Sequence, residues 1–379
     1  MAQHYNPHIV TDGLVLCLDA KDGLGRGPNL ISNGEFTDGT SGWTGYAGTT
    51  LSRAAASSDP GSASGGSDDF CLKVSGPYMA YTSISTVIGK SYWVALRGYE
   101  GGGDPGRNSL KISNTSDGGN LTGTSEVYIT PDATWVAKTQ TFTATATTTY
   151  IRVGANSGGG GGSNLSYFDS ISVYEMLWKD LSGNGNDGSV TSAVYNSSGY
   201  FDFDGTDDMV KISAGFSFND NNEGTIAAWV KHDGSGNGYI GAFRNNANKW
   251  FSLRPGGTYI GIYDYYNGTR AIGSCSTTAV DDSKWHYITR AKTNGTTSDR
   301  FYVDGITQSY SITDGALEDK WFDHHDSGTL EFLIAPRWAN GAYGGFYDGN
   351  IATVHVYSRP LSQSEILQNY NAQRGRFGV

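Results

Sequence analysis

Short runs of apolar and β-branched residues, separated by clusters of Gly, Asn and Asp, recur along the whole chain. Runs of this kind, bounded by turn-forming residues, are typical of β-strands, and many short strands are typical of β-sandwiches. The pattern therefore predicts an all-β protein. The clearest predicted strands are residues 14–18, 92–96, 149–153, 168–174, 225–230 and 351–357.

Helical periodicity is almost absent before the last residues of the chain. Ser362 and Glu365 have the spacing of a capping box, in which each side chain satisfies a backbone N–H at the start of a helix. We therefore expect one short helix over residues 365–370. The side chains expected to pack onto a sheet are Ile366, Leu367 and Tyr370.

Composition supports this reading and adds a domain count. The chain has 379 residues, of which 54 are Gly, about double the ordinary share, and 17% are charged, against an ordinary share of about 25%. Aromatic residues make up 13% of the chain, enough large apolar surface to argue against disorder. A chain of this length is expected to form two domains.

The net charge of the chain is −11, and no cluster of basic residues interrupts it. Nucleic acid is therefore not an expected partner. No apolar run approaches the roughly 20 residues that span a bilayer, and the first residues lack the basic and then apolar pattern of a signal peptide. Neither a membrane partner nor standard export is expected. Cys17, Cys71 and Cys275 are odd in number and far apart, so we expect buried thiols and no disulfide framework.

Two phrases point to a carbohydrate-binding fold. Residues 29–36 (NLISNGEF), followed by Trp43, resemble the first strand of jelly rolls related to cellulose- and xylan-binding modules. Residues 167–174 (YFDSISVY) resemble the closing strand of the same family. The resemblance implies a jelly-roll domain over residues 28–175.

A second set of phrases lies outside that block and resembles concanavalin A-like, laminin-G-type sandwiches. Its members are residues 11–19 (TDGLVLCLD), 178–188 (WKDLSGNGNDG), 201–208 (FDFDGTDD), 285–289 (WHYIT), 302–305 (YVDG) and 349–357 (GNIATVHVY). Far more residues separate Leu18 from Trp178 than in similar uninterrupted chains. We therefore expect two β-sandwich jelly rolls, residues 28–175 being inserted into a surface loop of a domain formed by residues 1–27 and 176–379.

Both ends of the chain resemble those of laminin-G-domain structural proteins of tailed, especially marine, phages: residues 7–14 (PHIVTDGL) and 371–379 (NAQRGRFGV). The resemblance implies a virion structural protein on the capsid or tail surface, present in many copies or as a homo-oligomer, with other virion proteins as partners. Arg374 and Arg376 lie near the C-terminus of an acidic chain and could pair with an acidic capsid surface. A solvated tail is an equal alternative. The expected assembly contacts are Arg374, Arg376 and Phe377.

No catalytic motif is found. Glycoside cleavage requires two carboxylates about 5–10 Å apart, and the Glu-x-Asp-x-x-Glu strand motif of related glycosidases does not occur. Nucleophile elbows, phosphate loops and His-Glu-x-x-His are also missing from the sequence. His324 and His325 are adjacent and flanked by Asp, which indicates a solvated acidic loop more than a metal site. We expect a protein that is not an enzyme.

Calcium is the one cofactor that the sequence suggests. Glu35 and Asp169 match positions where relatives of the jelly roll hold a structural Ca²⁺ between the first and last strands. A second acidic group has two interpretations: turn residues that hydrogen-bond their own backbone, or Ca²⁺ ligands. Its members are Asp202, Asp204, Asp207 and Asp208.

Sugar binding on sandwiches relies on exposed aromatic rings flanked by amide and carboxylate groups. The candidates are Trp43, Tyr46 and Tyr99 in the jelly roll, and Trp250, Tyr263, Tyr265 and Tyr266 in the surrounding domain. Packing in a core is the alternative for each ring. We expect weak glycan binding that many copies strengthen. The alternative functions are a secreted or cell-surface bacterial lectin or adhesin, and a polysaccharide depolymerase that has lost its motif.

Overall fold

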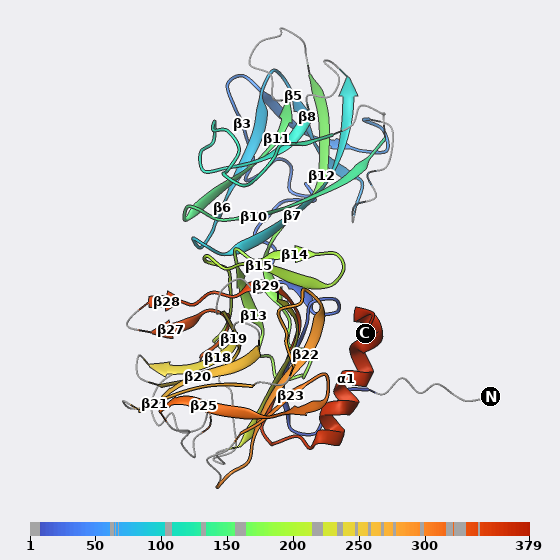
Figure 1. Ribbon diagram of the computed structural model, residues 1–379. Helices are drawn as coiled ribbons and strands as arrows, with labels where there is room; N and C mark the ends of the chain where they lie inside the picture. The colour runs from blue at the N-terminus through green and yellow to red at the C-terminus, as the bar shows by residue number, and fades with distance from the viewer. Residues whose placement is uncertain are drawn as a thin grey trace, which may run out of the picture. The chain divides into compact units, whose positions relative to one another are not determined.

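The computed structural model describes residues 8–60, 64, 66, 68–102, 108–129, 134–155, 164–213, 223–232, 238–246, 249–256, 259–266, 269–275, 278–295, 299–315, 321, 331–339 and 342–379. Antiparallel strands dominate these residues, and a single helix near the C-terminus accompanies them (Figure 1). The predicted all-β class is therefore confirmed. Each of the six strands predicted most clearly lies within an observed strand.

The chain divides into two compact units. Unit 1 comprises Met1–Gly25 and Leu177–Val379, and unit 2 comprises Arg26–Met176. The sequence of unit 2 thus lies between the two parts of unit 1. The sequence-based limits of 28 and 175 differ from these by two residues and one residue, because the strands β2 (Leu24–Arg26) and β12 (Leu165–Trp178) run across the boundary.

Unit 2 is built from two antiparallel layers that share one core. The first layer has the order β3 (Thr44–Gly45), β6 (Met79–Ser85), β11 (Thr148–Ala155), β8 (Asn108–Ser113) and β9 (Val127–Tyr128). The second has the order β4 (Thr50–Ala55), β5 (Phe70–Ser75), β12, β7 (Ser91–Gly102) and β10 (Val136–Thr143). Ile151 and Val153 of β11 enter the core with Val94 of β7, so the intervening residues of β11 point outward.

Unit 1 is a larger sandwich. Its first sheet has the order β14 (Val194–Asn196), β15 (Tyr200–Asp204), β29 (Asp348–Tyr357), β17 (Gly224–His232), β22 (Trp285–Lys292), β23 (Asp299–Val303) and β24 (Ile306–Gln308), and β1 (Leu14–Asp19) also pairs with β29. Its second sheet has the order β13 (Gly188–Thr191), β16 (Met209–Ile212), β26 (Glu331–Ala335), β18 (Tyr239–Asn246), β19 (Lys249–Gly256), β20 (Tyr259–Tyr266), β21 (Thr269–Cys275) and β25 (Tyr310–Gly315).

A buried ion cluster joins these two sheets. Arg290 of β22 donates to Asp264 of β20 at 2.9 Å and to Asp299 of β23 at 2.6 Å, and all three side chains are buried. A buried guanidinium requires such partners, because an unpaired charge in the interior is strongly destabilising. Asp264 therefore points into the sandwich, and its neighbours Tyr263 and Tyr265 lie on the opposite face of β20.

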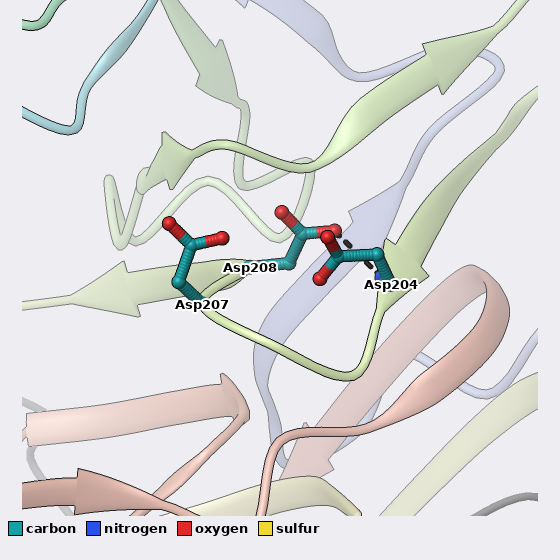
Figure 2. Close-up of side chains that lie close together, drawn as sticks. All are labelled: Asp204, Asp207 and Asp208. Carbon is teal, nitrogen blue, oxygen red and sulfur yellow. Dashed lines mark hydrogen bonds between the residues drawn. The ribbon is translucent and has the colours of Figure 1, made fainter.

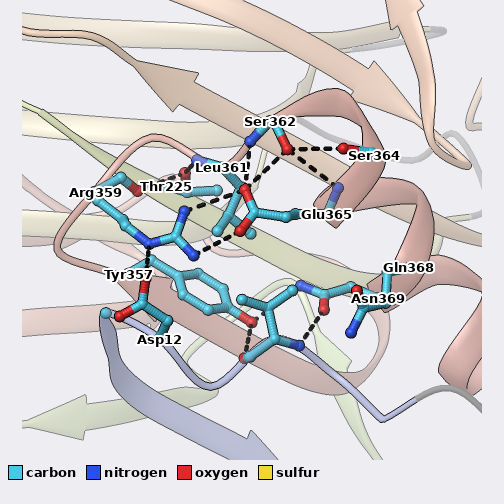
Figure 3. Close-up of polar contacts among 12 residues, drawn as sticks. Asp12, Thr225, Tyr357, Arg359, Leu361, Ser362, Ser364, Glu365, Gln368 and Asn369 are labelled. Atoms are coloured by element: carbon cyan, nitrogen blue, oxygen red, sulfur yellow. Dashed lines mark hydrogen bonds and ion pairs between the residues drawn. The ribbon is translucent and has the colours of Figure 1, made fainter.

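The helix α1 (Gln363–Phe377) begins after the predicted capping box. Ser362 accepts from the Glu365 backbone, and Glu365 accepts from the Ser362 backbone (Figure 3). Ile366 is fully buried, and Tyr370 stacks on Trp229 with ring centroids 5.6 Å apart. Leu367 is 43% exposed and lies beside Gly305, in the turn between β23 and β24, so the prediction that it packs onto the sheet is met only at the edge of the sheet. One residue turns a helix by about 100°, which rotates Leu367 out of the stripe of Ile366 and Tyr370.

The last residues of α1 are held within unit 1. Arg376 binds the carboxylate of Asp19 at 2.7 and 2.9 Å, and Phe377 stacks on Trp229 at 4.3 Å. Both side chains are therefore engaged in the packing of α1. Arg374 is exposed, while Arg376 and Phe377 are half-buried. The role of all three residues as assembly contacts stays a prediction.

The three cysteines can be compared directly with their prediction. Cys17, Cys71 and Cys275 are free and buried, as predicted, and burial is the main cause that raises the pKa of each thiol to about 12.

Within the described part of the chain, no helix is long and apolar enough to span a membrane. The glycine run at residues 158–162 and the pair His324 and His325 lie outside the described residues.

Candidate functional site

The outward face of the five-stranded sheet of unit 2 carries polar and aromatic side chains. Arg152 of β11 lies opposite Tyr81 of β6 on one side and opposite Lys111 of β8 on the other. Residues directly opposite in a sheet share a face, and this face is opposite to the core residues Ile151 and Val153. The three side chains therefore form one row across the sheet.

Two of these side chains are cations that the fold keeps nearly covered. Arg152 is 6% exposed and Lys111 is 9% exposed, although both lie on the outward face. Lys111 pairs with Glu126 at 3.4 Å, and one Arg152 nitrogen donates to the backbone oxygen of Gly118. Burial lowers the pKa of Arg152, while Asp117, Tyr46 and Glu126 act in the opposite direction. Charged side chains are rarely buried without a partner or a function.

A hollow of about 290 Å³ opens over these cations. Its wall includes Tyr46 and Tyr78, whose rings meet edge to face at 5.6 Å, together with Asp117 and Gly118. The volume is near the lower end of small-molecule sites, which span roughly 300–1,000 Å³. The hollow has the size of a site for a single small polar unit.

The chemistry of the hollow suits a polyol. Tyrosine rings pack against the apolar faces of flat ligands, and the Arg152 guanidinium and Lys111 ammonium are donors to hydroxyl oxygens. Asp117, exposed at the rim, is an acceptor for hydroxyl hydrogens. The Nε of Arg152 is covered and has no hydrogen-bond partner in the described structure. An added acceptor at this guanidinium would offset that deficit.

Tyr46 is the one predicted sugar-binding ring that lines this hollow. Trp43 is 7% exposed, packs in the core against Phe36 at 5.7 Å and donates to the backbone of Asn33, so its prediction as an exposed platform is wrong. A turn closed by the Trp43 N–H and the Thr40 carbonyl at 3.0 Å leads into the residue, and its large apolar ring gains more from the core than from water. Tyr99 is half-buried against Trp135 and Tyr167.

The candidates of unit 1 lie in the second sheet. Tyr263 and Tyr265 are half-buried on the face of β20 that is opposite to Asp264. The side chains of Trp250 and Tyr266 are outside the described residues. Sugar binding by these four residues stays a prediction.

Four polar or aromatic residues of the hollow were not predicted as site residues from the sequence: Tyr78, Lys111, Asp117 and Arg152. The alternation in residues 149–153 does place Tyr150 and Arg152 on one face of a strand. Lys111 joins them only through the pairing of β8 with β11, which connects positions about 40 residues apart in sequence. Tyr78 and Tyr46 come together through loops that have no periodic signal.

The predicted calcium ligands lie in one acidic region of unit 2. Asp169 is fully buried, and burial is the main cause that raises its pKa to about 6, with Glu35 and Asp68 acting in the same direction. Ser170 donates from its side chain to Glu35 at 3.5 Å and from its backbone to Asp169 at 2.7 Å. One oxygen of Asp68 is buried without a hydrogen-bond partner in the described structure. A set of hard oxygen donors with an unsatisfied carboxylate fits Ca²⁺.

The acidic turn of unit 1 supports both of its interpretations. Asp208 accepts from the Asp204 backbone at 2.8 Å (Figure 2). Asp204 accepts from the Thr206 backbone at 2.8 Å, as turn residues do. Carboxylate oxygens of Asp204, Asp207 and Asp208 also lie within 4.8 Å of one another, a spacing that a metal ion requires. Burial is the main cause that raises the pKa of Asp208 to about 7.

Several solved structures are similar to parts of this chain. The Ruminococcus gnavus IT-sialidase CBM40 bound to α2,3 sialyllactose has 14% identity and a TM-score of 0.33 over 42% of this chain and 94% of that chain. Domain 4 of an extracellular arabinanase from Geobacillus stearothermophilus, in complex with arabinotriose, has 16% identity and a TM-score of 0.36 over 51% and 92%. A Trypanosoma rangeli sialidase has 16% identity and a TM-score of 0.39 over 54% and 32%.

A comparison with curated proteins found no match. A family model does match within unit 1, over residues 204–367, from the acidic turn into α1. The matched region includes β17, β22, β29 and the strands of the second sheet from β16 to β26. What residues 204–367 match is the model of the Concanavalin A-like lectin/glucanases superfamily, so this part of the chain is similar to that superfamily.

Proposed function

We propose that the protein binds glycans without cleaving them, and that the hollow over Arg152 and Lys111 is a sugar site. One observation carries the proposal: two cations on the outward face of a sheet are nearly covered, beside two tyrosine rings, over a hollow of about 290 Å³. The core of unit 2 does not require cations at these positions, whereas a sugar does use ring faces and charged hydrogen-bond donors. The superfamily match of unit 1 supports a lectin-like role for the whole chain.

The test is a glycan array with the purified full chain, followed by isothermal titration calorimetry with the best ligand. Arg152→Ala and Tyr46→Ala should each weaken binding about tenfold or more, because each removes a contact at the centre of the hollow. Arg152→Lys should retain part of the affinity, since it keeps the charge and loses the planar fork. Arg53→Ala, at an exposed arginine of β4 in the other layer of unit 2, is the matched control and should bind as the wild type does.

Thermal melting of each variant separates lost binding from lost folding. The proposal is wrong if no glycan binds to the wild-type chain. It is also wrong if a ligand binds equally well to folded Arg152→Ala and Tyr46→Ala. Release of reducing ends from the bound glycan would replace the binding function with an enzymatic one.

Display on a virion surface, as a capsid decoration, head fibre or tail-associated protein, is a separate proposal that rests on the resemblance of the two chain ends. Many copies on one particle would turn a weak sugar affinity into strong adhesion. Mass spectrometry and cryo-electron microscopy of purified phage particles test it. An ordered, multicopy surface component is the expected result, and absence from particles would favour a bacterial lectin or adhesin.

We also propose that Glu35 and Asp169 hold a structural Ca²⁺ in unit 2. The support is the fully buried Asp169 and the unsatisfied Asp68 oxygen in the same acidic region. Such an ion would neutralise carboxylates that burial otherwise destabilises.

A further inference from the structure

The two cations at the hollow of unit 2 are compensated to different extents. Lys111 has a counter-ion, because its ammonium lies 3.4 Å from the carboxylate of Glu126, and each of these side chains is 11% exposed. Arg152 lies opposite Lys111 in the sheet and is 6% exposed. Among the described residues, no carboxylate forms an ion pair with the Arg152 guanidinium. Its charge is therefore nearly covered without a counter-ion in contact, which is unfavourable in the absence of a ligand.

The hydrogen bonds of Arg152 leave one edge of its guanidinium unused. Nη1 donates to the backbone oxygen of Gly118, on the wall of the hollow. Nε is covered and has no hydrogen-bond partner, and the described part of the chain provides none for Nη2 either. Nε and Nη2 together present two parallel N–H groups, the geometry that matches the two oxygens of a carboxylate. A single hydroxyl oxygen cannot satisfy both groups in this way.

Two acidic residues act on this guanidinium without a direct bond to it in the described structure. The charges of Asp117 and Glu126 oppose the fall in the pKa of Arg152 that burial causes. Glu126 is engaged elsewhere, since it pairs with Lys111 and accepts from the Tyr128 hydroxyl at 3.2 Å. Asp117 is exposed at the rim of the hollow. Its carboxylate partly offsets the positive charge, and a substitution there leaves the packing of unit 2 intact.

We propose that the hollow selects a sugar unit that carries a carboxylate, a hexuronate of an acidic polysaccharide, over the neutral counterpart of that unit. This selectivity rests on the sugar-binding function proposed above and names the class of ligand. The carboxylate would pair with the unused edge of Arg152, and the charge of Lys111 on the next strand would add attraction. The rings of Tyr46 and Tyr78 supply apolar surface for the sugar ring.

The rest of the chain works against anions, so the selectivity depends on the local arrangement. The net charge of −11 repels an acidic polysaccharide at long range. A hollow of about 290 Å³ also limits the contact to a small part of such a chain. Recognition therefore falls on one carboxylate at one guanidinium, and the removal of either charge should be visible in the affinity.

The test is calorimetric titration of the full chain with oligomers of galacturonate, glucuronate and mannuronate, each beside its fully methyl-esterified form. At least one of the acids should bind. Its ester should bind at least about tenfold more weakly, because the ester keeps the sugar ring and loses the charge. The comparison of acid with ester requires no variant, so it does not depend on the folding of a mutant.

Three variants place the charge effect at the hollow. Arg152→Gln should weaken binding of the acid about tenfold or more and bring acid and ester to similar affinities. Asp117→Asn keeps an acceptor oxygen and removes a like charge, so it should raise the affinity for the acid relative to the ester by about threefold. Arg53→Gln, at an exposed arginine of β4 in the other layer of unit 2, loses one positive charge away from the hollow. It is the matched control and should keep the wild-type ratio.

Each outcome of these titrations bears on a different claim. Equal affinity of the wild type for acid and ester would overturn the selectivity, as would an unchanged ratio in folded Arg152→Gln. If neutral glycans of the array bind and none of the acids does, the selectivity is wrong while the sugar-binding function remains. If no glycan of either kind binds, the sugar-binding function itself is wrong.

Discussion

Asp169 shows how one buried carboxylate depends on its surroundings. It is fully buried beside Glu35 and Asp68, and its pKa is raised to about 6, mainly by burial. Ser64 and the Ser170 backbone donate hydrogen bonds to Asp169, which lower its pKa, but burial outweighs them. The ionised side chain is thus destabilising unless a cation accompanies it.

If Ca²⁺ occupies this region, it should stabilise the folded chain by about 2–3 kcal/mol at a free concentration about 100 times its dissociation constant. Thermal melting with Ca²⁺ and with a chelator should show the shift in the wild type and not in Asp169→Asn. Asp207→Asn, in the acidic turn of unit 1, is the control. A shift that survives in Asp169→Asn and disappears in Asp207→Asn would place the ion in the turn.

His286 provides a prediction about pH. Its ring nitrogens lie 2.8 Å from Asp304 and 3.1 Å from Asp282. Burial lowers the pKa of His286, but the two carboxylates outweigh burial, and the net direction is upward. Burial likewise opposes the shift of Asp282, and hydrogen bonds from Lys284 and His286 lower its pKa to about 2. His286 and Asp282 are therefore both charged in mildly acidic solution.

A folded pKa above the unfolded value of about 6.5 means that protonated His286 stabilises the fold. That stability is fully present below about pH 6.5 and is lost as pH rises through the folded pKa. Urea unfolding of wild type and His286→Gln between about pH 5 and pH 9 should show a difference that shrinks on the alkaline side. A difference that stays constant or grows with pH would contradict this assignment. Asp208 titrates in both proteins, so its contribution cancels.

At the scale of one element, α1 is attached to the sandwich by a narrow stripe. Ile366 is fully buried and Leu367 is 43% exposed, although they are adjacent and similar in size. Ile366→Ala should cost about 2–4 kcal/mol of the free energy of unfolding, and Leu367→Ala less than about 1 kcal/mol. Denaturant unfolding measures both. Equal costs would mean that helix propensity, and not packing on Trp229, determines the stability of α1.

The start of α1 could be predicted from the sequence, and its end could not. Ser362 and Glu365 form a local motif whose hydrogen bonds depend only on spacing, and the structure contains both of them. The predicted end at residue 370 is seven residues too early, because Phe377 extends the helix through stacking on Trp229 and Trp285. Those tryptophans belong to β17 and β22, far away in sequence.

At the scale of the whole molecule, the two units have separate cores. We expect two calorimetric transitions on heating, with a total enthalpy larger than a single two-state fit gives. Arg290→Gln breaks the buried ion cluster of unit 1 and should destabilise that unit by about 3–5 kcal/mol, while the transition of unit 2 stays in place. One cooperative transition that moves as a whole in this variant would show that the units do not unfold independently.

The sequence by itself determined the strands, the capping box and the burial of the three cysteines, because these depend on local periodicity, spacing and side-chain type. Only the tertiary structure decided which aromatic rings are exposed and which cationic side chains lie side by side on one sheet face. Trp43 is buried in the core, and Phe377 stacks on Trp229 of the sheet. Arg152 lies beside Lys111 because their strands pair. A single strand fixes the face of each side chain but not the strand that lies beside it, so a site formed across a sheet is visible only once the register is known.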